Sequence, residues 1–148
     1  MEKSIENTSI IQQIKQQLNL PDTDLKSYSP LTLAFIGDGV YDLVIRTMIV
    51  EKGNAPVNKL HKQVSNLVKA PAQMELFHRI EVMLSEEELA IYKRGRNAKS
   101  FTSAKNASIT EYRIATGLEA LIGYLYLDNR FGRVLELIDA GLNRQIGD

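Results

Sequence analysis

Residues 34–50 read "AFIGDGVYDLVIRTMIV", a stretch that is apolar on nearly every side when it is wound into a helix. Such a helix is expected to be central and to pack against several neighbours. Three charges interrupt it at intervals of four, so Asp38, Asp42 and Arg46 share one face. Asp42 and Arg46 have the spacing of an ion pair worth about 0.2–0.5 kcal/mol on an exposed helix, whereas Asp38 has no such local partner.

The rest of the chain predicts an all-α fold. Prolines at positions 21, 30, 56 and 71 separate the segments, and no polar–apolar alternation is long enough for a convincing strand. Capping-box patterns begin at Ser85 and Ser108, and Ser29 precedes a first-turn proline. We expect helices at residues 5–19, 30–51 and 56–69, from 71 onward, and at 86–95, 108–127 and 131–146, with a polar loop before the long helix at 108–127.

Composition narrows the class of protein. The 148 residues fit one domain, which we divide into an N-terminal helical extension, 1–25, and a main body, 26–148. No cysteine is present, which excludes disulfides, a thiol nucleophile and cysteine-based metal sites. No signal peptide is recognised and no 18-residue stretch is free of charge. We therefore expect a cytoplasmic protein with no membrane association.

A net charge of zero hides two basic tracts. Lysines and arginines number 18, as do the acids, yet residues 52–74 and 92–110 contain no acid at all. Such tracts fit either solvated helix faces or a surface that binds phosphates. The basic residues considered for phosphate contact are Lys59, Lys62, Lys93, Arg94, Arg96, Lys99 and Lys105.

A second long apolar helix also carries a lone acid. Glu119 is the only charge in "TGLEALIGYLYL", residues 116–127, where Gly117 and Gly123 permit close approach of a neighbouring helix. A buried carboxylate without a partner costs several kcal/mol, so Asp38 and Glu119 require one. Two readings remain open: a buried salt-bridge network, or a shared Mg²⁺ or Mn²⁺ site. Beside basic tracts, the metal site would indicate phosphodiester hydrolysis.

The same two helices resemble the catalytic helices of the ribonuclease III domain, which is all-helical. The resemblance lies in "LAFIGDGVYDLVI" and "ATGLEALIGYLYLDNRFGRVLEL". Two further stretches, "VNKLHKQVSNLVKAPAQ" and "LSEEELAIYKRGRNAKSFTSAKNAS", resemble the Mini-III branch, which lacks a double-stranded-RNA-binding domain. In all, the resemblance covers residues 30–142, and it makes 26–148 the catalytic domain.

The resemblance implies a homodimeric endoribonuclease that cuts double-stranded RNA with Mg²⁺, or Mn²⁺ as a substitute. The products would carry 5′-phosphate and 3′-hydroxyl ends. Asp38 and Glu119 fall on the family's metal-binding catalytic acids. The implied substrate is the precursor of 23S ribosomal RNA, and the implied partner is the large ribosomal subunit or one of its proteins.

Two positions depart from the wider family, although the Mini-III branch shares both departures. Ala34 and Thr116 stand where that family carries carboxylates, so four acids become two. We expect weaker metal binding and one tightly held ion, with the Thr116 hydroxyl as a possible addition to its surroundings. Asp42 is either an outer neighbour of the site or simply the partner of Arg46.

The basic residues divide into those with a local explanation and those without one. Lys93, Arg94 and Arg96 close a helix, where cations also suit the helix dipole. Lys99 and Lys105 lie in the loop and have no such explanation, so we expect the loop to grip the RNA. Two alternatives to the nuclease are a non-catalytic RNA-binding ribosome-assembly factor on the same fold, and a structural helical dimer whose acids form salt bridges.

Overall fold

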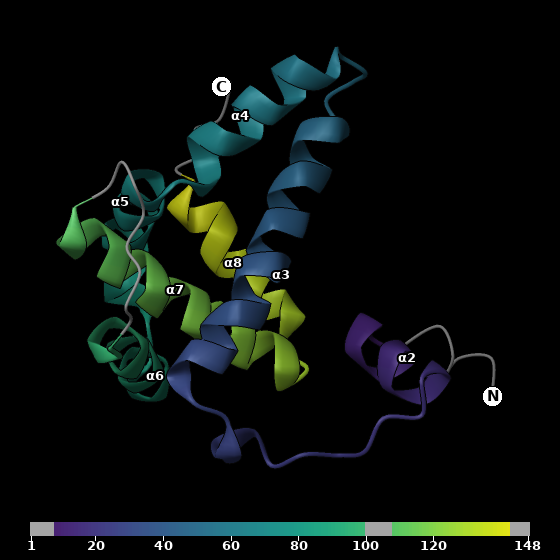
Figure 1. Cartoon of the computed structure of the whole chain (residues 1–148), viewed down its shortest axis with the longest axis vertical. Helices are drawn as coiled ribbons and strands as arrows, with labels where there is room; N and C mark the ends of the chain where they lie inside the picture. Colours follow the sequence, from purple (N-terminus) through teal and green to yellow (C-terminus); the bar gives the residue numbers. More distant parts are fainter. Residues whose placement is uncertain (1–7, 100–107, 143–148) are drawn as a thin grey trace.

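The computed structural model describes residues 8–99 and 108–142, and throughout these ranges the regular structure is helical, as predicted (Figure 1). From α3 onward the helix boundaries agree closely with those expected from the sequence, whereas α2 is shorter than the expected helix at 5–19, because residues 8 and 9 are not helical and residues 18 and 19 form a turn. The expected ends at 5–7 and 143–146, and the loop residues 100–107, lie outside the described residues. The α-helices are α2 (Ile10–Gln17), α3 (Pro30–Val50), α4 (Val57–Val68), α5 (Ala70–Ile80), α6 (Glu86–Asn97), α7 (Ile109–Leu127) and α8 (Phe131–Gly141).

The predicted caps form the helix starts. The Ser29 hydroxyl accepts a hydrogen bond from the backbone N–H of Thr32 at 3.2 Å and opens α3. At α7, the backbone N–H of Glu111 donates to the Ser108 hydroxyl at 3.0 Å, and the Ser108 N–H donates to the Glu111 carboxylate at 2.8 Å. These bonds satisfy backbone groups that a helix end leaves without partners, so they fix where the two long helices begin.

Helices α3 and α7 cross at the centre of the molecule with their backbones in contact (Figure 1). A Cβ atom on Gly37 would lie 1.8 Å from the carbonyl oxygen of Glu119, and one on Gly123 would lie 1.9 Å from that of Leu33. Gly117 faces α6 in the same way, 2.7 Å from the ring of Tyr92. The close approach predicted for Gly117 and Gly123 is therefore confirmed.

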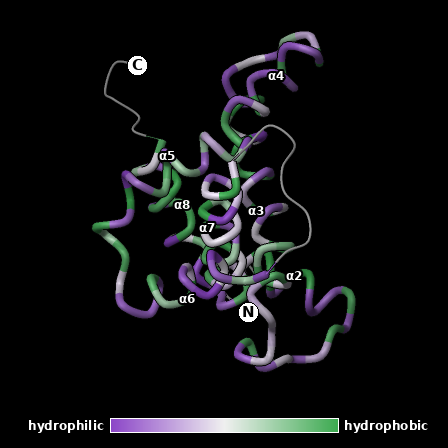
Figure 2. The backbone as a smooth tube through the Cα atoms, turned by 60° about the vertical axis from the view of Figure 1, so that its left-hand side comes forward, coloured by the Kyte–Doolittle hydropathy of each residue, from purple (hydrophilic) through white to green (hydrophobic). Residues whose placement is uncertain are grey.

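The hydrophobic core surrounds α7. Figure 2 shows hydrophobic residues gathered where α5, α7 and α8 meet, while much of α4 is hydrophilic. The expectation that α3 packs on several sides is confirmed only in part. Tyr41 and Ile45 are fully buried, but Phe35 is 81% exposed and Leu43 is 55% exposed. One face of α3 is thus apolar and uncovered, which the apolar pattern alone did not distinguish.

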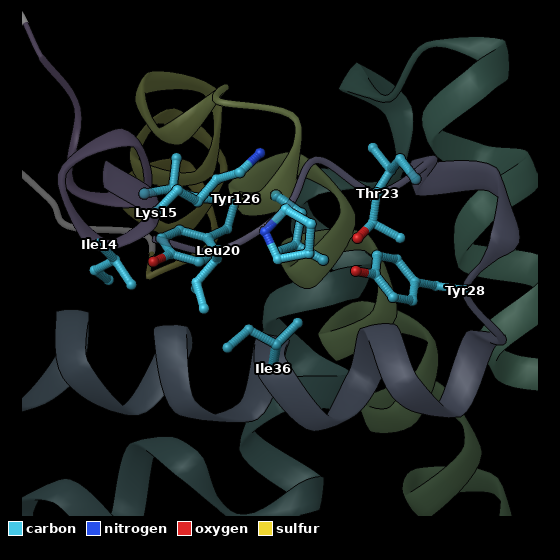
Figure 3. Close-up of a pocket in the computed structure, with 11 residues that line it drawn as sticks. Ile14, Lys15, Leu20, Thr23, Tyr28, Ile36 and Tyr126 are labelled. Carbon is cyan, nitrogen blue, oxygen red and sulfur yellow. The ribbon is translucent and has the colours of Figure 1, made fainter. Parts of the chain in front are cut away.

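The N-terminal helix α2 packs loosely on the body and has no buried residue. A hollow of about 300 Å³ separates it from α3 and the end of α7. Ile14, Leu20 and Tyr126 lie close together along this hollow, and Ile36 of α3 lies across from them (Figure 3). Within the described ranges, no helix has the length and apolar character to cross a membrane.

An ion pair joins α6 to α8. Glu88 is only 1% exposed, and the guanidinium of Arg133 donates to both of its carboxylate oxygens at 2.8 Å. The same guanidinium donates to the carbonyl oxygen of Met83 at 2.8 Å. Glu88 also accepts from the N–H of Ser85 in the capping box. The hydrogen bonds from Arg133 hold the pKa of Glu88 at about 2, below its ordinary value of 4.5.

Replacing Gly123 by alanine should separate the two central helices. The new methyl group would meet the Leu33 carbonyl oxygen, which belongs to a rigid helix and cannot rotate away. We expect Gly123→Ala to lower the free energy of unfolding by about 3 kcal/mol, measured by urea titration. Gly132→Ala on α8 is the control, because nothing lies within 4 Å of its added methyl group. Equal stability of the two variants would contradict the backbone contact.

The ion pair of Glu88 should make the free energy of unfolding depend on pH in the acidic range. Its folded pKa lies below its unfolded one, so its stabilising contribution is complete above about pH 5 and is lost as the pH falls through 4.5 toward 2. We expect the urea midpoint of the parent to fall more steeply over this interval than that of Glu88→Gln. Glu86→Gln, at an exposed position of the same helical turn, should behave like the parent. Parallel curves for the parent and Glu88→Gln would refute the assignment.

Candidate active site

The crossing of α3 and α7 brings Asp38 and Glu119 together. Asp38 follows Gly37, and Gly37 itself packs against the backbone of Glu119. The Asp38 carboxyl lies near enough to the Glu119 carboxyl that its charge helps to raise the pKa of Glu119. Asp38 is exposed and Glu119 is only partly so. The pair therefore forms a two-carboxylate site that opens to solvent on the Asp38 side.

The surroundings disfavour a negative charge on Glu119. Burial raises the pKa of its carboxyl well above the ordinary value of 4.5, and the charge of Asp38 raises it further. Burial, followed by the charge of Glu119, also raises the pKa of Tyr41. A cation placed at Asp38 and Glu119 would relieve this repulsion and favour the ionised form of both acids.

Gln73 of α5 is a site residue that the sequence analysis missed. Its side-chain amide nitrogen donates to a carboxylate oxygen of Glu119 at 3.1 Å and to the carbonyl oxygen of Val68 at 2.9 Å. Its amide oxygen is buried and has no hydrogen-bond partner among the described residues. A signal was present in the sequence, because Gln73 is the one polar member of a stripe whose other buried members are Leu76, Phe77 and Ile80.

The described residues bear on the two readings of the paired acids. Within residues 8–99 and 108–142, no lysine, arginine or histidine forms a salt bridge with Asp38 or Glu119, so the salt-bridge network is not found there. Two adjacent carboxylates are hard oxygen donors of the kind that suits Mg²⁺ or Mn²⁺. In the same ranges, no further histidine or acid joins the pair to make a group of three.

Ala34 and Thr116, the two residues that depart from the wider family, are both buried. Ala34 is buried in a small apolar cluster with Leu33 and with Ala120 of α7. Thr116 is buried one turn before Glu119, and its hydroxyl donates to the carbonyl oxygen of Tyr112 at 2.9 Å. The Thr116 oxygen thus lies on the helix that carries Glu119, with its hydrogen already engaged.

Asp42 has the local partner that its spacing predicted. The Nε atom of Arg46 donates to the Asp42 carboxylate at 2.6 Å, and both side chains are partly exposed. This ion pair accounts for Asp42 without any contact to Glu119. Asp42 therefore differs from Asp38, one turn earlier on α3, which has no cationic partner among the described residues.

The predicted RNA-binding residues lie on two separate helices and in a loop. Lys59 and Lys62 are exposed on α4, and Lys93 and Arg94 are exposed on α6. Figure 1 places α4 and α6 at different ends of the molecule, with the crossing of α3 and α7 between them. The remaining basic residues differ in their surroundings: Arg96 lies over the ring of Tyr92, 5.7 Å from its centroid, Lys99 is exposed, and Lys105 lies outside the described residues.

This helical domain is similar to several known proteins. A family model described as the ribonuclease III domain matches residues 31–130. The Mini-ribonuclease 3 of Clostridium tetani is 53% identical over 81% of this chain and 80% of its own length. The Mini-ribonuclease 3 of a Thermoanaerobacter species is 49% identical over 94% of each chain. A crystal structure of a Fusobacterium nucleatum protein superposes with a TM-score of 0.74 at 34% identity, covering 80% of this chain and 96% of that one.

These likenesses extend over most of the chain and include both helices of the two-carboxylate site. The chain therefore belongs to the ribonuclease III family of endoribonucleases, in its Mini-ribonuclease 3 branch.

Proposed function

We propose that this endoribonuclease cleaves double-stranded RNA with Mg²⁺, or with Mn²⁺ in its place, at the Asp38–Glu119 pair. The products carry 5′-phosphate and 3′-hydroxyl ends. The observation that carries the proposal is the convergence of two acids from two buried helices with no cationic partner in the described part of the chain. Membership of a family of endoribonucleases supports the reaction class.

Asp38 and Glu119 hold the ion, and each contributes differently. A divalent ion bound there supplies a water of lowered pKa and neutralises charge on the phosphoryl oxygens. Asp38 is exposed and presents its carboxylate on the side from which RNA arrives. Glu119 contributes from the more buried side, where Gln73 restrains it. Since Ala34 and Thr116 add no charge, we assign one tightly held ion to each site, with the Thr116 oxygen as a neutral neighbour.

The basic residues bind the phosphates of the duplex on both sides of the acids. Lys93, Arg94 and Lys99 lie along the end of α6 and the start of the following loop, which also contains Lys105. Lys59 and Lys62 offer a second contact on α4. A-form RNA is recognised mainly through its backbone and 2′-hydroxyls, so we expect weak sequence preference. In bacteria, the substrate we favour is the precursor of 23S ribosomal RNA, processed in the cytoplasm on the large ribosomal subunit or with one of its proteins.

The working unit is a homodimer formed through the uncovered face of α3. Phe35 is 81% exposed, Leu43 is 55% exposed and Val50 is 54% exposed, all on the helix that carries Asp38. A second copy covering this face would bury its apolar surface, at about 25 cal/mol per Å². Two copies would then place two acid pairs on one duplex. Residues 26–148 form the catalytic unit of each copy, and 1–25 form an extension.

Removing either acid should abolish cleavage while leaving the fold intact. The parent protein and the variants Asp38→Asn and Glu119→Gln are each incubated with a precursor 23S stem and Mg²⁺. The control variant is Glu75→Gln, which changes an exposed acid of α5. We expect both site variants to lose more than the roughly 10–100-fold that loss of an outer neighbour of a metal costs. The control should cut normally.

Three outcomes would contradict parts of this proposal. Undiminished cutting by Asp38→Asn would remove the acid pair from the reaction. Duplex binding without cleavage by the parent, unchanged by Mg²⁺, would favour a non-catalytic assembly factor, for which the carboxylates missing at positions 34 and 116 are the supporting observation. Equal rates on the precursor stem and an unrelated duplex, with or without large-subunit proteins, would contradict the 23S assignment.

A charge on the uncovered face of α3 should break the dimer. Phe35→Glu places a carboxylate in the apolar contact, and we expect light scattering after gel filtration to report a monomer. Val82→Glu is the matched control, because Val82 is 93% exposed but lies in a short 3₁₀ turn away from α3. A parent that is already monomeric, or a Phe35→Glu variant that remains dimeric, would contradict the proposed interface.

A further inference from the structure

Gln73 lies where three helices meet. It is 2% exposed, sits in the first turns of α5, and reaches both the end of α4 and the middle of α7. Both hydrogens of its amide nitrogen are used, one by the Val68 carbonyl oxygen at 2.9 Å and one by the Glu119 carboxylate at 3.1 Å. The side chain is therefore held at two points, and one of them is an acid of the proposed metal site.

The orientation of this amide follows from its neighbours. The Val68 carbonyl and the Glu119 carboxylate oxygen both accept hydrogen bonds, so the nitrogen must face them. Turning the amide over would place its oxygen against two other oxygens. The amide oxygen is consequently the end that is buried without a partner in the described residues.

Packing does not explain a glutamine at this position. Leaving a buried amide oxygen without a hydrogen bond is unfavourable, and an apolar side chain would avoid that loss. The rest of the same stripe is indeed apolar, with Leu76, Phe77 and Ile80 all buried. What glutamine adds over an apolar residue is two hydrogen bonds, one to the Val68 carbonyl oxygen at the end of α4 and one to Glu119, 46 positions along the chain.

A second hydrogen bond ties the other acid-bearing helix to the same place. The hydroxyl of Tyr41, which is 1% exposed on α3, donates to the Leu67 carbonyl oxygen at 3.1 Å. The junction of α4 and α5 is thus bonded to α3 through Tyr41 and to α7 through Gln73. This junction braces both helices of the acid pair at neighbouring carbonyl groups.

We infer that Gln73 is a positioning residue for the metal-binding carboxylate of Glu119. By bonding one carboxylate oxygen, Gln73 fixes the plane of the group and leaves the other oxygen for the ion. This role rests on the proposed metal site at Asp38 and Glu119, and it adds a residue from a third helix to that site.

Metal binding without RNA tests this role directly. Mn²⁺ is titrated into the metal-free, full-length protein, and the free ion is followed by electron paramagnetic resonance. The proteins are the parent, Gln73→Met, which keeps the volume and loses the amide, and Gln63→Met, the same change at a glutamine of α4. We expect the dissociation constant of Gln73→Met to rise about 10–100-fold, with Gln63→Met like the parent.

The cleavage assay should show a matching shift in metal dependence. The Mg²⁺ concentration that gives half-maximal cutting should rise for Gln73→Met, and cutting should recover at high Mg²⁺. Duplex RNA affinity in the presence of a chelator should not change. If circular dichroism shows that Gln73→Met is unfolded, Gln73→Asn is measured instead, because its amide is one methylene too short to reach Glu119 and the same weakening is expected.

The outcomes separate this inference from the function on which it rests. Parent-like Mn²⁺ affinity in Gln73→Met, or an equal loss in Gln63→Met, would overturn the positioning role and leave the acid pair in place. Asp38→Asn is titrated in parallel. If Asp38→Asn binds Mn²⁺ as tightly as the parent, or if the parent binds none, the metal site itself fails and the role of Gln73 fails with it.

Discussion

The contact between the backbones of α3 and α7 is the constraint on which the rest of the molecule depends. Gly37 and Gly123 remove the side-chain atoms that would hold these helices apart, since a Cβ on either would lie within 2 Å of a carbonyl oxygen. At ordinary helix separations of 8–10 Å, two short acids on facing helices do not necessarily meet. Here the crossing places the residue after Gly37 beside Glu119, so the position of the acid pair is set by rigid backbone.

Features encoded locally could be predicted from the sequence. The starts of α3, α6 and α7 depend on a serine and a residue three positions later, and the caps form as expected. The candidate acids were recognisable because each is a charge within a helix that is otherwise apolar for several turns. Gly123 was recognisable for a similar reason, since a glycine inside a long apolar helix needs a close neighbour to justify it. None of these inferences required knowing which helices are adjacent.

Apart from the pairing of Asp38 with Glu119, two acids that both lack a local partner, features that depend on pairing distant segments could not be predicted. Gln73 and Glu119 are 46 positions apart, and Glu88 and Arg133 are 45 apart. Glu88 was correctly assigned to a cap, but nothing local showed that its carboxylate would also receive Arg133. The same limit applies to α3, because an apolar pattern predicts burial but does not say which apolar side chains the fold covers. Phe35 and Ile45 look equally hydrophobic in sequence, yet only Ile45 is buried within the described chain.

The small number of acids in the proposed site and the hydrogen bond from Gln73 to Glu119 are linked by the way a site binds a divalent ion. A site with four carboxylates attracts a divalent ion by charge and tolerates some freedom in each ligand. This chain resembles a family of that kind, but Ala34 packs against Ala120 and the Thr116 hydroxyl bonds to its own helix. With two charges left in the proposed site, metal affinity would depend more strongly on how well each ligand is oriented beforehand, because a mobile carboxylate must lose rotational freedom when it binds. In the proposed role of Gln73, its buried amide restrains Glu119 in the folded protein, before any ion arrives.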